Sequence, residues 1–265
     1  MLERFAPART RKNTQRLTLF FLQCPQGFGH CLTVLLHCCH TPAHEVLFRQ
    51  IFLPSIPPGF EVRPHLIDVA GPGDYLSPEF LRCIRKKIEL VLDSIEAAPD
   101  AVIVWSDVDI RFFSLTPEYL QQELSRRQCH ILFQRESPRL SDVNTGFFVC
   151  ETNAAVREFF QSIRTDLESR SDENEQMAVN RLLASGSKGV TWDHLPTAFY
   201  ARTQGWPPPL RLAIYHANYT KGADGVGQKL AQFREIDRIH RLGWPAWLWS
   251  IIHRIPGRLL RGSAA

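Results

Sequence analysis

The alternation of apolar runs and polar breaks predicts where strands and helices lie along the chain. Apolar, β-compatible stretches at 33–39 and 60–69 indicate two strands. The run at 101–105 has no charged position, which is typical of a strand that is buried on both faces. Further strands are expected at 130–136 and 146–151, and less regular strands and loops at 189–201 and 210–222.

The segments between these strands show the period of amphipathic helices. The clearest helix follows Ser77, which can cap its N-terminus, and Pro78 suits the first helical position. Its apolar face consists of Phe80, Ile84, Ile88, Val91 and Ile95. Other helices are expected at 45–53 (ended by Pro54), after Thr116, at 153–167 and at 172–184. Because strands and helices alternate, we expect an α/β fold with a mostly parallel sheet and helices on both faces.

The composition is that of a globular protein and narrows the range of partners. The chain has 265 residues, 44% of them hydrophobic, and a net charge of +4. So mild a charge permits an anionic small-molecule substrate and does not indicate nucleic acid. Seven cysteines include no C-x-x-C pair, and this odd number without a framework favours a reducing compartment, so we expect a cytoplasmic protein.

The two ends of the chain differ from its middle. Residues 1–31 are expected to be a basic, poorly ordered leader, because polar residues and Pro25 interrupt the apolar part too early for a membrane span. We expect one catalytic domain at 32–238 and an amphipathic tail at 239–265. The apolar stripe of the tail consists of Trp244, Trp247, Leu248, Ile251, Ile252, Ile255 and Leu259, with arginines beside it. Such a helix either docks on the domain or makes peripheral contact with a membrane through 244–261, at its inner face.

Candidate chemistry begins where the most hydrophobic strand ends. Asp107 and Asp109 follow the run at 101–105 in the stretch VWSDVDIRFF. Ligands of open α/β sheets bind at the carboxyl ends of strands, and two close carboxylates repel each other unless a cation or proton relieves them. A divalent cation such as Mg²⁺ or Mn²⁺ would suit them. The alternative is a polar turn at the end of a strand, where aspartate is common.

Three later motifs resemble, together with this pair, those of a known family. VNTGFFVCE carries Asn144 and Gly146, NEQMAVNRLL carries Gln176, and YHANYTKG follows at 215–222. The ordered set resembles the nucleotide-diphospho-sugar transferase family, glycosyltransferases of the GT-A fold, over about residues 32–235. The resemblance implies a Rossmann-like α/β domain that binds a sugar nucleotide through a divalent metal, Mn²⁺ or Mg²⁺.

The resemblance also implies roles for individual residues. Asp107, Asp109 and His216 would bind the metal, with Asp109 the better candidate for direct coordination, and the two aspartates and Gln176 would form the catalytic set. The donor-binding residues would be Asn144, Gly146, Glu175, Asn218, Lys221 and Gly222, with Lys221 on the phosphates. Where relatives often have Asp-Gln, this chain has Glu175-Gln176, and Glu175 could instead close a capping box with Asp172. Arg82, Arg85 and Lys86 are expected to form a solvated helix face, or one of them, Lys86 in our choice, contacts the nucleotide.

The implied activity is transfer of a hexose or pentose from a nucleotide-diphosphate sugar to a hydroxyl of a glycan, lipid or protein. The resemblance favours retention of configuration. One alternative is a metal-dependent phosphohydrolase with Asp107 as nucleophile, although Arg111 does not fit the usual D-x-D-x-[T/V] pattern. Another alternative is a non-catalytic binding protein with a degenerate transferase fold.

Overall fold

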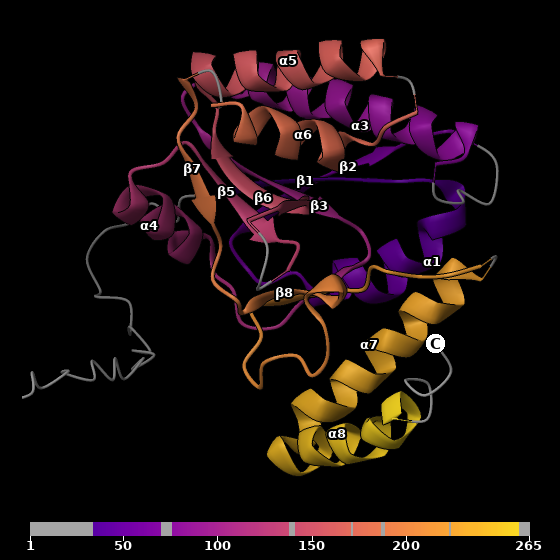
Figure 1. The fold of residues 1–265 in the computed structure, drawn as a ribbon. Coiled ribbons are helices and arrows are strands. Elements are labelled where there is room, and N and C mark those ends of the chain that lie inside the picture. Colours follow the sequence, from indigo (N-terminus) through magenta and orange to yellow (C-terminus); the bar gives the residue numbers. More distant parts are fainter. Residues whose placement is uncertain are drawn as a thin grey trace, which may run out of the picture. The chain divides into compact units, whose positions relative to one another are not determined.

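The centre of the molecule is a six-stranded sheet with the order β2-β1-β3-β6-β5-β7 (Figure 1). The computed structural model describes residues 34–69, 76–137, 141–170, 172–186, 189–222 and 224–259, with side chains to residue 252. The strands are β1 (Val34–His40), β2 (Phe60–Leu66), β3 (Val102–Asp107), β5 (Ile131–Arg135), β6 (Val143–Glu151) and β7 (Trp192–His194). The expected leader at 1–31 lies outside the described residues.

Strand directions confirm the expected α/β fold with a mostly parallel sheet. β1 is parallel to β2 and to β3, and β5 is parallel to β7. β6 alone runs in the opposite direction and pairs antiparallel with β3 and β5. The reversal follows from the short connection between β5 and β6, because a parallel crossover needs a dozen or more residues.

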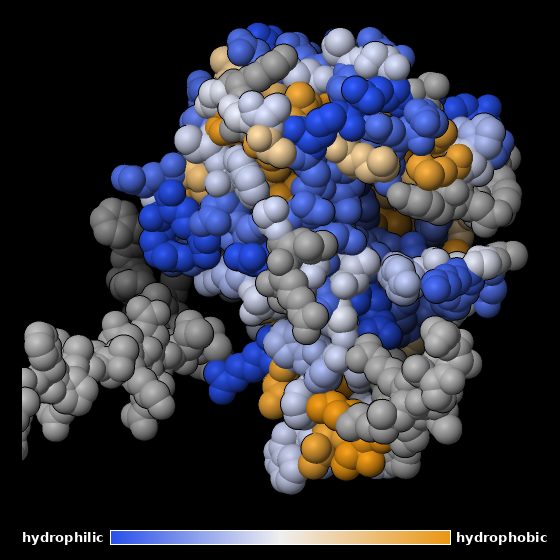
Figure 2. Space-filling model, viewed as in Figure 1, coloured by the Kyte–Doolittle hydropathy of each residue, from blue (hydrophilic) through white to orange (hydrophobic). Residues whose placement is uncertain are grey.

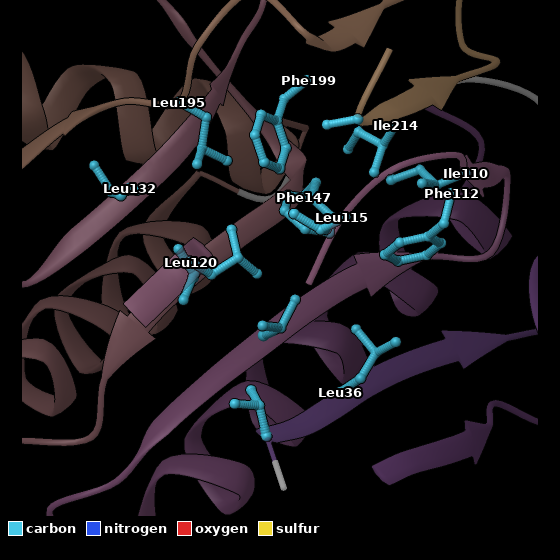
Figure 3. Packing of buried hydrophobic residues seen from close by; sticks show 14 of the residues in the cluster. Leu36, Ile110, Phe112, Leu115, Leu120, Leu132, Phe147, Leu195, Phe199 and Ile214 are labelled. Atoms are coloured by element: carbon cyan, nitrogen blue, oxygen red, sulfur yellow. The ribbon is translucent and has the colours of Figure 1, made fainter. Parts of the chain in front are cut away.

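Helices cover both faces of this sheet. α3 (Pro78–Ala97), α5 (Ala154–Ser169) and α6 (Glu175–Ala184) pack together on one face, at the top of Figure 1. Ile103 and Trp105 of β3 point into this layer, whereas Val104 points to the other face. There it belongs to a cluster with β6 and α4 (Pro117–Arg127), of which Leu120 and Phe147 are drawn in Figure 3. Both faces of β3 are therefore apolar, which explains the uninterrupted hydrophobic run.

A smaller sheet brings a late part of the chain back to the end of β3. It consists of β4 (Ile110–Phe112), β9 (Ile214–His216) and β8 (Phe199–Ala201), in that order. β4 pairs antiparallel with β9, with Ile110 opposite His216. The chain thus passes from the large sheet to the small one through the turn at Val108 and Asp109, and His216 is placed beside that turn.

Two helix boundaries differ from the expected ones. Pro54 does not end its helix: α1 (Glu45–Leu47), the π-helical η2 (Phe48–Phe52) and α2 (Leu53–Ser55) run on to Ser55. The run still ends one residue after Pro54, as expected for a residue that has no N–H to donate to a helical hydrogen bond. α6 begins at Glu175 and not at 172, because Asn174 is its cap and accepts from the Met177 amide. This boundary does not fit a capping box between Asp172 and Glu175, the alternative role of Glu175.

The described chain ends in a pair of helices. α7 (Gly225–Leu242) packs on the small sheet through Phe233, Ile236 and Ile239, and α8 (Trp244–Leu259) follows a break at Gly243. The boundary expected after residue 238 falls within α7. Among the described residues, we find no helix with the length and apolar character needed to span a bilayer.

Candidate functional site

The turn between β3 and β4 places the two aspartates of the D-x-D motif at the rim of the large sheet. Asp107 is the last residue of β3, and Asp109 directly precedes β4. The amide of Ala217 donates to the Asp109 carbonyl at 2.9 Å, which extends the pairing of β4 with β9. This ladder holds His216 against the turn, although more than 100 residues separate the histidine from the motif.

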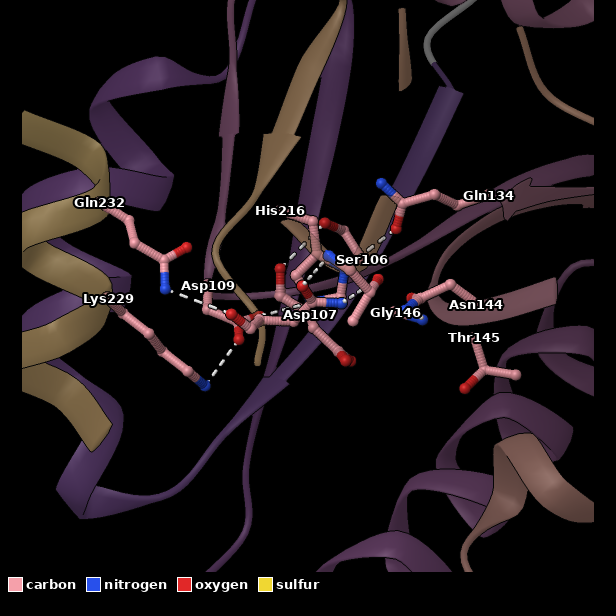
Figure 4. Close-up of polar contacts among 12 residues, drawn as sticks. Ser106, Asp107, Asp109, Gln134, Asn144, Thr145, Gly146, His216, Lys229 and Gln232 are labelled. Atoms are coloured by element: carbon pink, nitrogen blue, oxygen red, sulfur yellow. Dashed lines mark hydrogen bonds and ion pairs between the residues drawn. The ribbon is translucent and has the colours of Figure 1, made fainter. Parts of the chain in front are cut away.

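Asp107, Asp109 and His216 form a compact group of possible metal ligands (Figure 4). One ligand atom from each lies within 4.8 Å of the others, and Nε2 of His216 is 3.3 Å from Oδ1 of Asp109. Asp109 and His216 are buried. Two carboxylates and one imidazole suit Mn²⁺ or Mg²⁺, and a cation would relieve the repulsion between the carboxylates. The donor set therefore fits a divalent ion.

The His216 ring is held in one orientation and one tautomer by Gln134. The Gln134 amide nitrogen donates to the Phe199 carbonyl at 3.2 Å, so its oxygen is left to accept from Nδ1 of His216 at 2.9 Å. With the proton on Nδ1, the lone pair of Nε2 faces the aspartates and is available to a metal. Gly146 makes room for the ring, because a Cβ there would collide with Cε1 of His216.

Asp107 faces a buried lysine that also holds the start of α6. Lys87 Nζ is 2.9 Å from Asp107 Oδ1, 2.9 Å from Glu175 Oε1 and 3.2 Å from the Thr145 carbonyl. Burial alone would lower the pKa of Lys87, but the two carboxylates outweigh it and raise this pKa. Burial raises the pKa of Asp107 against the charge of Lys87, and nearby Asp109 raises it further. Lys87 therefore links the motif to the start of α6.

Asp109 has a different counter-ion, which comes from α7. Lys229 Nζ lies 2.6 Å from Oδ2 of Asp109, on the side away from His216. Burial would raise the pKa of Asp109, but Lys229 and His216 outweigh it and hold this pKa well below its usual range. Asp109 is therefore ionised at neutral pH and able to bind a cation.

A cavity of about 200 Å³ opens beside these groups, between the end of β1 and the first turns of α3. Asp107, Asp109, Lys87 and Lys229 form its charged side. The rest of the wall consists of Cys39, His40, Thr41, His44, Ile67, Val69, Glu79, Phe80, Cys83, Ile84 and Val108. It is concave, largely apolar and charged at one end, as binding sites for small molecules usually are.

The predicted donor-side residues lie on β6 and α6, next to the ligand group. Gly146 contacts His216, and the Asn144 oxygen accepts from the Gly146 amide at 2.8 Å. Glu175 is buried and bonded to Lys87 and to the Thr145 hydroxyl. The Gln176 oxygen accepts from the Thr145 amide at 3.4 Å. The structure thus brings these four predicted residues to one side of the aspartates.

Four other predicted residues have contacts elsewhere. Lys86 is exposed and pairs with Glu89 on its own helix. The Asn218 side chain bonds to Thr203. Lys221 and Gly222 are exposed, and the Lys221 ammonium lies over the Tyr219 ring. None of the predicted donor-binding residues is among those that line the cavity; the four on β6 and α6 lie next to the aspartates, whereas these four do not contact them in the structure as described.

Sequence reasoning missed Lys87, Gln134 and Lys229. A signal existed for Lys87: it lies three residues after Ile84 and four before Val91, within the apolar face of α3. A lysine in such a place is buried only when it is paired. Gln134 is likewise a polar residue inside an apolar strand, whereas nothing in the sequence of α7 distinguishes Lys229.

Comparisons with known proteins agree with this geometry. Residues 56–233 match the family model of nucleotide-diphospho-sugar transferases. No curated protein matches the chain. Among solved structures, a glycosyltransferase involved in the glycosylation of the major capsid of PBCV-1 has a TM-score of 0.52 and 12% identity, covering 76% of this chain and 98% of that chain. This likeness shows that the fold is GT-A.

Two further structures are less similar. Mouse xyloside xylosyltransferase 1 has a TM-score of 0.44 and 12% identity, over 70% of this chain and 97% of that chain. The galactosyltransferase LgtC, in complex with donor and acceptor sugar analogs, has a TM-score of 0.47 and 14% identity, over 75% and 94%. The family model spans well over half of the sequence, from before the D-x-D motif to beyond His216, and the chain therefore belongs to the nucleotide-diphospho-sugar transferase family.

Proposed function

We propose that the protein is a metal-dependent glycosyltransferase, which moves a hexose or pentose from a nucleotide-diphosphate sugar to an acceptor hydroxyl with retention of configuration. The observation that carries this proposal is the group of Asp107, Asp109 and His216 beside a cavity. A glycan, lipid or protein would supply the hydroxyl.

The leaving diphosphate gains negative charge during transfer, and the site is suited to receive it. When bound, Mn²⁺ or Mg²⁺ would supply charge stabilisation at the diphosphate. Asp107, Asp109 and His216 would hold the ion, while Gln134 keeps Nε2 of His216 free for it. Lys221, on the exposed loop after β9, would contact the phosphates once that loop closes over the donor.

The sugar would lie against β6 and α6. Asn144, Glu175 and Gln176 offer amide and carboxylate groups to its hydroxyls, and Lys87 fixes Glu175 in place. Glu175 is buried and the wall of the cavity is largely apolar, so little water would reach the donor sugar. This limits hydrolysis of the donor. Gly222, Asn218 and Lys86 complete the proposed donor set.

Calorimetry with Mn²⁺ and a panel of nucleoside diphosphates tests the proposal. Wild-type protein is expected to bind at least one of UDP, GDP, CDP or ADP only when Mn²⁺ is present. Asp109→Asn removes one ligand charge and should abolish this affinity without unfolding the chain. Asp93→Asn, which neutralises an exposed carboxylate on α3, is the matched control and should bind as wild type does. Equal metal-dependent affinity in Asp109→Asn and wild type would contradict the assignment.

Assays of turnover distinguish the proposal from its two alternatives. A phosphohydrolase would release inorganic phosphate from nitrophenyl phosphate with Mg²⁺, and a non-catalytic binding protein would hold the nucleotide without turnover. Under the proposal, turnover of the preferred sugar nucleotide transfers or slowly hydrolyses the sugar. The anomeric configuration of the first product, read by proton NMR, tests retention.

We propose in addition that α8 makes peripheral contact with an anionic membrane at its cytoplasmic face, through 244–261. Ala246 and Ser250 are buried against the domain, whereas Trp244, Leu248, Trp249 and Ile252 are exposed. Apolar side chains gather over α8 at the lower end of Figure 2. Arginine lies beside them, with the Arg238 guanidinium 4.2 Å from the Trp249 ring centre. Exposed tryptophans with arginine neighbours suit a negatively charged lipid interface.

Co-sedimentation of the full chain with vesicles tests this contact. Phosphatidylglycerol vesicles are expected to pellet wild-type protein and phosphatidylcholine vesicles are not. Trp244→Ser/Trp249→Ser should lose most of the binding, whereas Leu66→Ser, at an exposed leucine of β2, should not. Equal pelleting of the double variant and wild type would count against a lipid contact.

The free cysteines at 38, 39, 83, 129 and 150 support the cytoplasmic location.

A further inference from the structure

Lys229 differs from Lys87 in how many of its hydrogen-bond donors are used. An ammonium group has three N–H donors. Those of Lys87 meet Asp107, Glu175 and the Thr145 carbonyl, so this lysine has no donor to spare. Within the described part of the chain, the ammonium of Lys229 has a single partner, Oδ2 of Asp109. Two of its donors therefore remain for a ligand.

The position of Lys229 directs these donors into the cavity. The residue lies in the second turn of α7, and its side chain extends from the helix to Asp109 (Figure 4). Its side chain is about one-sixth exposed, at 17%, and it lines the cavity together with Asp107, Asp109 and Lys87. A lysine head on a flexible four-carbon stem can leave Asp109 and follow a ligand within this space.

We infer that Lys229 couples the binding of the metal ion to that of the diphosphate. Without a diphosphate, its ammonium holds Asp109 and opposes the ion; with a diphosphate, the ammonium contacts the phosphate oxygens and the ion takes Asp109. The inference rests on the proposed function and adds to it a phosphate-binding residue that the family resemblance did not assign.

The balance of charge in the site supports this coupling. Three carboxylates, those of Asp107, Asp109 and Glu175, face the ammonium groups of Lys87 and Lys229. A divalent ion added alone would leave an excess of positive charge in a buried place, which is unfavourable. A diphosphate that arrives with the ion cancels this excess and returns the site to the net negative charge of its own side chains. Removal of Lys229 should therefore favour the ion alone and disfavour the diphosphate.

The test measures the two affinities separately in wild type and in Lys229→Met. The binding of Mn²⁺ alone is followed by loss of the EPR signal of the free ion. The binding of the nucleoside diphosphate that wild type prefers is followed by calorimetry at saturating Mn²⁺. In Lys229→Met, Mn²⁺ alone should bind about 10-fold more tightly and the nucleotide about 10-fold more weakly, within the usual range of coupling between sites. These opposite changes separate coupling from general damage to the site.

Two controls complete the design. Arg234→Met removes a positive charge from an exposed position on the same helix and should change neither affinity. Lys229→Arg retains the positive charge, so its affinities for Mn²⁺ alone and for the nucleotide should stay close to those of wild type. Unchanged affinities in Lys229→Met, or a loss of both, would overturn the coupling while leaving the proposed function intact. Failure of wild type to bind any of the nucleotides with Mn²⁺ would overturn both.

Discussion

The two aspartates of the D-x-D motif are separated by a single residue, yet they belong to two different parts of the molecule. Asp107 faces α3 and α6 through Lys87, whose side chain is only 5% exposed and makes three polar contacts. Asp109 faces the late part of the chain, through His216 of β9 and Lys229 of α7. The lysine on the first side is fully engaged, and the lysine on the second side is not.

This difference separates two tasks within one site. On the Asp107 side, Lys87 joins β3, β6 and α6 into one hydrogen-bonded unit, which fixes the position of Glu175 and of the proposed donor-binding residues beside it. On the Asp109 side, the contacting residues are His216 of the small sheet and Lys229 of α7. Under our inference, Lys229 exchanges Asp109 for the phosphate oxygens of the substrate. We conclude that the Asp107 side supplies rigidity and the Asp109 side supplies the response to ligands.

The largest expected effect comes from breaking the rigid side. Lys87→Met leaves the buried Glu175 and the partly exposed Asp107 without their shared counter-ion. Removal of one partner from a buried ion pair usually lowers the free energy of unfolding by about 3–5 kcal/mol. Urea denaturation should show a loss of this size in Lys87→Met.

A matched change on the other side completes this test. Lys229→Met leaves the buried Asp109 with His216 as a partner, so the expected loss is smaller, about 1–3 kcal/mol. The double variant Lys87→Met/Glu175→Gln should recover part of the stability, because it removes one of the two carboxylates left without a counter-ion. Equal losses in the two single lysine variants would break the comparison.

Much of the fold could be predicted from the sequence because local patterns determine it. The cap at Ser77 and the stripe from Phe80 to Ile95 mark α3, and the charge-free run at 101–105 marks a strand buried on both faces. The reversal of β6 and the length of the helix through Pro54 were not predicted. The reversal could have been found, because the residues between the expected strands at 130–136 and 146–151 are too few for a parallel crossover. The helix boundary at Pro54 was placed two residues too early, and such boundaries are the least certain part of a sequence-based prediction.

The site residues likewise divide into those that local sequence motifs predict and those that only the packing of distant segments brings together. Asp107, Asp109 and His216 could be proposed from an ordered set of motifs, and the structure places their ligand atoms together. Lys229 could not be proposed, because its partner is 120 residues away and only the packing of α7 on the small sheet brings the two together. Lys87 could have been found, since a lysine on an apolar helix face calls for a buried partner.

The second prediction concerns Gly146 of β6, which lies against the His216 ring on the Asp109 side of the site. In Gly146→Ala, the added Cβ would collide with Cε1 of His216 and lie 3.0 Å from its Nδ1 and 2.9 Å from the Asn144 oxygen. Overpacking of this kind costs about 1–3 kcal/mol. We expect a stability loss in this range, together with weaker Mn²⁺ binding, because the ring must shift.

Gly225→Ala is the control for the added methyl group. Its Cβ would meet the Thr220 hydroxyl at 3.4 Å, an ordinary contact, in the first turn of α7. The free energy of unfolding should change by less than about 0.5 kcal/mol. If Gly146→Ala is as stable as wild type and binds Mn²⁺ equally well, the position of the His216 ring does not require a glycine at residue 146.

The smallest expected effect concerns Gln134, which holds the histidine tautomer and touches neither aspartate. Gln134→Met keeps the length of the side chain but removes the acceptor for Nδ1 of His216. The ring then loses the bond that fixes its proton on Nδ1, and Mn²⁺ affinity should fall about 10-fold, as is usual when the partner of a metal-binding histidine is removed. The Phe199 carbonyl loses one donor but keeps Gln204 at 3.4 Å, so the fold should survive.

Gln134→Glu distinguishes a role in orientation from simple packing. The carboxylate still accepts from Nδ1, so the tautomer should be retained and Mn²⁺ affinity should stay closer to wild type than in Gln134→Met. Nitrogen-15 NMR of the histidine rings reports which nitrogen carries the proton. If His216 carries its proton on Nδ1 in Gln134→Met as in wild type, the small sheet alone orients the ring. His216 would then keep its orientation without Gln134. Among the described residues that contact Asp109, Lys229 would be the one expected to move when a ligand binds.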